Sequence, residues 1–126
     1  MLSISLVIRY HESQPVSQLL GCIDSVISVN YEFDEIIILQ TNADIQSEVL
    51  EQFGSSIVGR ITFLTLSSLT DNRAAALVRG IRSSKSTYII FLDSDDFLNS
   101  FPDFDLLEKM LPFDFLSFSY IEAYYD

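Results

Sequence analysis

Four short apolar runs, each followed by a polar stretch, set the pattern of the chain. They cover residues 4–8, 35–39, 61–66 and 88–92 and are rich in β-branched and aromatic side chains. Such runs are typical of strands buried on both faces of a sheet. Helical spacing of apolar residues separates one run from the next, and this alternation predicts a mostly parallel sheet with right-handed crossovers. We therefore expect a three-layer α/β/α fold.

Three helices are predicted between these strands. The first begins at Ser13 or Gln14, with Pro15 in its first turn, where its missing N–H is tolerated. Asp44 can cap the second and Gly54 can end it. The third begins at Thr70 or Asp71. The expected buried faces are Val16, Leu19, Leu20, Ile23, Val26 and Ile27, then Ile45, Val49 and Phe53, then Ala74, Leu77, Val78 and Ile81. Residues 100–110 predict another helix, and residues 113–121 alternate like a last strand.

The polar residues that follow the strands are expected to share one edge of the sheet. Arg9, Gln40 and Asp93 come directly after three of the apolar runs. In open parallel sheets, ligands bind outside the carboxyl ends of the strands. These three positions therefore mark the edge where we expect a binding site.

Asp93, Asp95 and Asp96 crowd the end of the last of these strands. Neighbouring carboxylates repel one another, and a hard divalent cation with oxygen ligands would oppose that repulsion. Acidic residues at this place can alternatively belong to a solvated turn or to the start of a helix, without binding a metal. A calcium loop of the EF-hand type fits poorly, because Leu98 stands where its glycine is needed and Phe104 where its glutamate is needed. We favour a metal site.

Composition and charge narrow the class of protein. The chain has 126 residues, which suits one domain, with 7 basic and 18 acidic residues and a net charge of -11. Such a charge argues against nucleic acid or an anionic membrane as a direct partner. No apolar run approaches the roughly 20 residues of a membrane span, and the start does not have the pattern of a signal peptide. The lone Cys22 permits no internal disulfide, which fits a reducing cytoplasm, and we expect it in the core. The protein is expected in the cytoplasm, where it could also be peripheral at the inner face of the membrane.

Three segments follow the pattern of one enzyme family. They are Glu35-Ile36-Ile37-Ile38, the Ala-rich stretch that ends in Gly80-Ile81, and Tyr88-Ile89-Ile90-Phe91-Leu92-Asp93-Ser94-Asp95-Asp96, which is the most specific. With the opening strand, they make residues 3–96 resemble the nucleotide-sugar half of family-2 glycosyltransferases. The resemblance implies the GT-A fold. It also implies inverting transfer of a sugar from a nucleotide-sugar donor, for which we expect a UDP-sugar, to a hydroxyl of a saccharide or glycolipid acceptor.

The resemblance assigns roles to the three aspartates. In that family an Asp-x-Asp element binds Mn²⁺ or Mg²⁺, which bridges the two phosphates of the donor. By position, Asp95 and Asp96 are implied as metal contacts, and Asp93 and Asp95 as nucleotide-sugar contacts. A cation there would stabilise the charge that develops on the leaving diphosphate. Polysaccharide or glycoconjugate synthesis is the expected setting.

The first departure from the family pattern follows the first strand. Arg9-Tyr10-His11-Glu12 stands where the family usually has Pro, any residue, Tyr and Asn. We expect Arg9, His11 and Glu12 at the donor site, with His11 or Tyr10 as a flat surface for the base. A lone histidine in a polar loop can equally be solvated.

Two further departures concern the base and the diphosphate. Gln40-Thr41-Asn42-Ala43 stands where the family usually has Asp-Asp-Gly-Ser, so Gln40 and Thr41 would read the base without a carboxylate. Leu77 and Val78 replace a frequent Arg and Asn. Arg73, one turn earlier, is therefore our candidate for contact with the diphosphate, although it can also be a solvated cation at a helix start.

Members of the family continue into an acceptor-binding half that carries a carboxylate base. No catalytic base is assigned here, and Glu122 and Asp126 are expected to be surface charges. Residues 1–126 are therefore expected to form a single donor-binding domain without the acceptor half. A partner domain or a homo-oligomer could complete it. The final aromatic residues would be core or interface, namely Phe113, Phe115, Phe118, Tyr120, Tyr124 and Tyr125.

Two alternative functions stay open at this stage. A degenerate, non-catalytic domain that binds a nucleotide sugar or serves in assembly is favoured by the altered base-reading segment. A phosphatase of the haloacid dehalogenase type also ends a strand in Asp-x-Asp, but there a Gly-Thr pair follows, whereas Asp96-Phe97 follows here.

Overall fold

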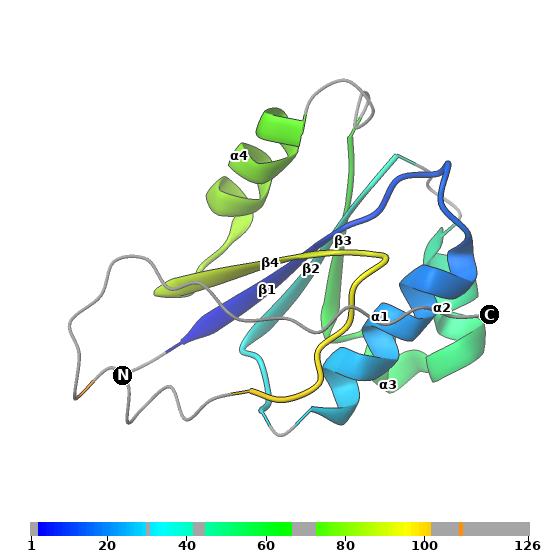
Figure 1. Ribbon diagram of the computed structural model, residues 1–126, viewed down its shortest axis with the longest axis horizontal. Coiled ribbons are helices and arrows are strands. Elements are labelled where there is room, and N and C mark those ends of the chain that lie inside the picture. Colours follow the sequence, from blue (N-terminus) through cyan, green and yellow to red (C-terminus); the bar gives the residue numbers. More distant parts are fainter. Residues whose placement is uncertain (1–2, 30, 42–44, 67–72, 102–108, 110–126) are drawn as a thin grey trace.

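A sheet of four parallel strands forms the centre of the molecule (Figure 1). The computed structural model describes residues 3–29, 31–41, 45–66, 73–101 and 109. The strands are β1 (Ile4–Arg9), β2 (Glu35–Gln40), β3 (Ile61–Thr65) and β4 (Tyr88–Asp93), in the order β3-β2-β1-β4. Every pairing is parallel, which confirms the predicted sheet.

Helices cover both faces of this sheet (Figure 1). They are α1 (Val16–Ser28), α2 (Ile45–Phe53), the short α3 (Ser55–Val58) and α4 (Arg73–Ser83). α1, α2 and α3 lie on one face and α4 on the other, as a three-layer fold requires. Gly54 ends α2 as predicted and, with φ of 89°, makes the sharp turn into α3, which the sequence pattern did not predict. The strand predicted at 113–121, and the helix predicted at 100–110 apart from residues 100, 101 and 109, lie outside the described residues.

The larger of two apolar cores lies between the sheet and α1. Alternate residues of β1 enter it, and α1 contributes the face that its spacing predicted. Its fully or almost fully buried members include Ile4, Leu6, Ile8, Leu19, Cys22, Ile23, Val26, Ile38 and Val49. Cys22 is thus a core residue, as expected.

The contact of α4 with the sheet differs from the prediction. Ala76 and Gly80 face the smaller core around Val7, Ile37 and Leu39, whereas Val78 is 43% and Ile81 51% exposed. A Cβ on Gly80 would lie 3.0 Å from Val7 Cγ1. Small residues four positions apart let α4 approach the sheet closely, and the larger apolar residues then point elsewhere.

The start of α1 also differs from the prediction. The N-cap position is Pro15, which makes no side-chain capping bond, and the helix begins at Val16. Ser13 and Gln14 do not cap it because their side chains bond to other groups: Ser13 Oγ lies 2.5 Å from His11 Nδ1, and Gln14 Oε1 bonds with Ser94. Gln14 thereby connects the loop after β1 to the loop after β4.

Candidate functional site

The three aspartates gather in a turn at the carboxyl end of β4. Asp93 is the last residue of the strand, and the Asp96 N–H donates to the Asp93 carbonyl at 2.9 Å, which closes the turn. One carboxylate oxygen from each of Asp93, Asp95 and Asp96 lies within 4.8 Å of the other two. Two oxygens bound to one ion at about 2.1 Å are at most about 4.2 Å apart, so the cluster is close to the span of a single coordination sphere.

The electrostatics of the turn favour a bound cation. Asp96 is exposed, but partial desolvation, followed by the charges of Asp95 and Asp93, raises the pKa of its carboxyl group. Cys22 lies beneath the turn, and its Sγ–H points to the Asp93 carbonyl at 3.8 Å. Burial and then the three aspartates raise the pKa of the Cys22 thiol to about 12, so at neutral pH the thiol adds no charge to the site. Three oxygen donors that repel one another suit Mn²⁺ or Mg²⁺.

Arg9 brings a positive charge into contact with this turn. It ends β1, directly beside Asp93 in the register, and its Nε lies 3.3 Å from Asp93 Oδ1. β2 and β4 flank β1, with α1 on one face and α4 on the other, so this is the topological switch point of the sheet. Ligands bind at such points in open α/β sheets. The ion pair therefore stands at the mouth expected of a binding crevice.

Ser94 and Gln14 hold the acidic turn in place, and neither was among the predicted site residues. Ser94 is fully buried; its N–H donates to the Arg9 carbonyl at 3.0 Å, and its hydroxyl donates to Gln14 Oε1 at 2.5 Å. On the far side of the turn, the Leu98 N–H donates to Ser25 Oγ at 2.9 Å. The sequence signal that could have identified Ser94 is its place between Asp93 and Asp95. A small uncharged side chain there is short enough to be buried.

A second group of polar side chains follows β1 and β2 at the same edge. His11 Nε2, Gln40 Oε1 and Thr41 Oγ1 are buried atoms with no hydrogen-bond partner among the described residues. His11 Nδ1 accepts from the Ser13 N–H at 3.0 Å, so in the neutral ring Nε2 carries the proton and is a donor. Burying an unpaired polar group costs free energy. Such atoms are able to bond to a polar ligand or to water.

The remaining predicted site residues are placed less closely. Glu12 is exposed in the loop after β1. Arg73 is the first residue of α4, and its side chain lies outside the described part of the structure. The structure thus brings Arg9 together with Asp93, Asp95 and Asp96, and it puts His11, Gln40 and Thr41 along the same edge.

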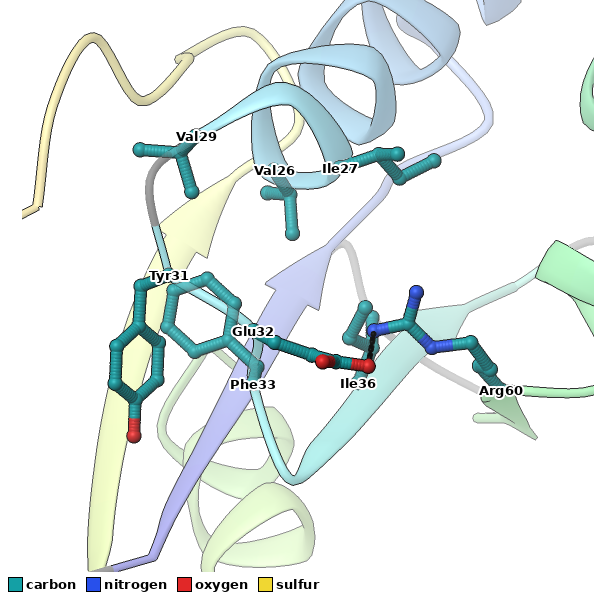
Figure 2. Close-up of a pocket in the computed structure, with 8 residues that line it drawn as sticks. All are labelled: Val26, Ile27, Val29, Tyr31, Glu32, Phe33, Ile36 and Arg60. Carbon is teal, nitrogen blue, oxygen red and sulfur yellow. Dashed lines mark ion pairs between the residues drawn. The ribbon is translucent and has the colours of Figure 1, made fainter.

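A cavity of about 310 Å³ lies elsewhere, at the amino edge of the sheet (Figure 2). Val26, Ile27, Val29 and Ile36 line its apolar side. At its mouth Arg60 Nη2 and Glu32 Oε1 form an ion pair of 3.5 Å, with the two side chains 41% and 84% exposed. An exposed pair of this kind contributes little stability. The cavity lacks the convergent carboxylates found at the carboxyl edge.

Among the helices that the structure describes, none has the length and apolar character needed to cross a membrane.

Comparisons with known proteins agree with this geometry. The sequence model of glycosyl transferase family 2 matches residues 5–113. Two crystal structures of S. aureus TarS have the same fold. One has a TM-score of 0.57 at 14% identity, covering 78% of this chain and 17% of that one. The other, of TarS 1-349, has a TM-score of 0.59 at 12% identity, covering 86% and 31%.

No curated protein matches this chain in a sequence search. The family match spans the four strands, the acidic turn and the helices between them. The chain therefore belongs to glycosyl transferase family 2 and has the GT-A fold.

Proposed function

We propose that residues 1–126 form the donor-binding domain of an inverting, metal-dependent glycosyltransferase. The donor is a nucleotide sugar, for which we favour a UDP-sugar, and the acceptor is a hydroxyl of a saccharide or glycolipid. Family membership supports glycosyl transfer. The observation that carries the proposal is the group of three carboxylates at the switch point of the sheet.

In this proposal the two polar groups at the edge divide the donor between them. Asp95 and Asp96 hold Mn²⁺ or Mg²⁺, with Asp93 beside them, and the cation supplies positive charge opposite the diphosphate. His11, Gln40 and Thr41 provide buried atoms without partners for the base and sugar. Gln40 offers an amide donor and an acceptor, which together match a pyrimidine edge. Glu12 and Arg73 stand at the outer margin of the donor site.

The acceptor side of the reaction is assigned to a protein larger than this domain. The chain spans 17% and 31% of the two TarS chains. We therefore propose donor binding as the activity of these residues, and transfer as the activity of a protein or assembly that adds an acceptor site. Such an assembly would serve polysaccharide or glycoconjugate synthesis.

Calorimetry with UDP, with and without Mn²⁺, tests the proposal. Asp96→Asn removes the charge of a proposed metal ligand. In this variant, Mn²⁺ should no longer increase the affinity for UDP. Even loss of a group that supports a metal ligand typically costs roughly 10- to 100-fold in affinity, so loss of a ligand itself should cost at least about tenfold. Glu51→Gln, at an exposed carboxylate of α2, is the matched control and should behave like the unmodified chain. UDP binding that ignores both Mn²⁺ and Asp96→Asn would contradict the proposal.

A further inference from the structure

Arg9 lies beside the aspartates at the carboxyl edge, and the proposed role of the aspartates leaves it unexplained. Its Nε contacts Asp93 Oδ1 at 3.3 Å, with the two side chains 23% and 37% exposed. Within the described residues, its two terminal amino groups have no hydrogen-bond partner. Arg9 is therefore held at one nitrogen and open at two, beside the carboxylates that would hold a cation.

From this position Arg9 should weaken the binding of a cation and strengthen the binding of a diphosphate. Its positive charge neutralises Asp93 and repels a divalent cation that approaches Asp95 and Asp96, which weakens cation binding. The same charge attracts a diphosphate, and the planar guanidinium matches phosphate oxygens better than a single carboxylate contact at 3.3 Å. The two ligands of this site should thus respond to Arg9 in opposite directions.

We propose that Arg9 exchanges partners when the donor binds: it leaves Asp93 for the diphosphate, and the negative charge of Asp93 then adds to the attraction of the cation. This inference rests on the proposed function and adds a source of coupling to it. The exchange makes the cation and the nucleotide assist each other's binding, because each favours the same arrangement of Arg9. In the absence of nucleotide, the ion pair keeps cation affinity low.

Two titrations on purified protein test the exchange. The first follows binding of Mn²⁺ alone, from the electron paramagnetic resonance signal of the free ion, and the second follows UDP binding at saturating Mn²⁺ by calorimetry. Arg9→Gln should bind Mn²⁺ alone about threefold or more tightly, because a repelling charge is gone. It should bind UDP roughly tenfold more weakly, because charge-assisted hydrogen bonds to the diphosphate are lost.

Two further variants separate this role from a structural one. Arg9→Lys keeps the charge but not the planar fork, so its affinity for Mn²⁺ alone should stay near that of the unmodified chain while UDP binding weakens. Arg60→Gln removes the same charge from the ion pair at the opposite edge and should change neither titration. Thermal unfolding of each variant checks that the fold is intact.

The outcomes are distinguishable. If the unmodified chain shows Mn²⁺-dependent UDP binding, but Arg9→Gln weakens both titrations or changes neither, the exchange is wrong and the proposed function stands. If the unmodified chain binds neither Mn²⁺ nor UDP, the proposed function fails and the role of Arg9 fails with it. Opposite shifts in Arg9→Gln, without them in Arg60→Gln, support the exchange.

Discussion

At the scale of single residues, the charge of the acidic turn changes the pKa of a neighbouring side chain that has no proposed role in ligand binding. Cys22 is the clearest case, since the residue is 1% exposed and its Sγ lies 3.8 Å from the Asp93 carbonyl oxygen. An aliphatic side chain there would fill the same core. The acidic turn thus contacts the buried face of α1 through Cys22. The pKa of the Cys22 thiol therefore reports on the charge of the acidic turn.

We expect alkaline pH to destabilise the chain through Cys22. The pKa of the thiol is about 12 in the folded chain and 9.0 in its ordinary state, so between these values only the unfolded chain releases the proton. The free energy of unfolding should fall above pH 9, by at most about 1.4 kcal/mol per pH unit. Tyr10, whose pKa burial also raises, acts in the same direction.

Urea unfolding at several pH values between 8 and 10.5 measures this effect, with Cys22→Ala as the comparison. The variant loses packing at every pH but keeps Tyr10, so the difference between the two chains isolates the thiol. That difference should shrink as pH rises above 9. A difference independent of pH would refute the assignment of the thiol to this buried, acidic surrounding.

At the scale of elements, the sequence predicted the sheet better than the packing of α4. Apolar runs gave the strand positions and their parallel order, and Ile36–Leu39 is buried as predicted. The burial predicted for residues 88–92 is wrong, because β4 lies at the edge of the described sheet and Phe91 is 41% exposed. In α4 the pattern misled, because Val78 and Ile81 gave a helical apolar stripe while Ala76 and Gly80 make the contact. Close approach of backbones rewards small residues, and a hydrophobicity pattern does not record that.

Gly80→Ala and Gly21→Ala should therefore change stability in opposite directions. Alanine favours a helix over glycine by up to about 1 kcal/mol, and Gly21 in α1 has no atom within 4 Å of an added Cβ. At Gly80 the added Cβ meets Val7, a buried, branched residue in the central strand β1. Overpacking there should outweigh the helical gain and cost about 1 kcal/mol net.

Chemical denaturation of the two variants provides the comparison. A double variant with Val7→Ala should remove the penalty of Gly80→Ala, because the crowded methyl groups are then absent. If Gly80→Ala stabilised the chain as much as Gly21→Ala, the close contact between α4 and β1 would be wrong.

At the scale of the whole molecule, the 18 acidic residues far outnumber the 7 basic ones. With a net charge of -11, the folded chain repels itself, and the acidic turn lies within that field. The sequence predicted this balance and the aspartates, since both are read directly from residue types. It did not predict Ser94 and Gln14, because their pairing depends on two loops that are far apart in sequence and meet only in the fold.

Salt should consequently affect folding and cation binding in opposite ways. Raising NaCl from about 10 mM to about 150 mM shortens the screening length from roughly 30 Å to roughly 8 Å. Self-repulsion then weakens and the unfolding temperature should rise, while attraction of Mn²⁺ to the site should fall. Thermal unfolding and Mn²⁺ titration at both concentrations measure the two effects. A change of the same sign in both would show that long-range charge is not the cause.

Ser25 gives the acidic turn a mechanical connection to α1. Its hydroxyl accepts from the Leu98 N–H at 2.9 Å and donates to the Cys22 carbonyl at 2.7 Å, while Ser94 fastens the other end to β1 through Arg9. The turn and the helix should thus shift as one rigid unit. Any movement of the carboxylates around an incoming ligand should therefore be felt at Ser25 and Cys22 of α1.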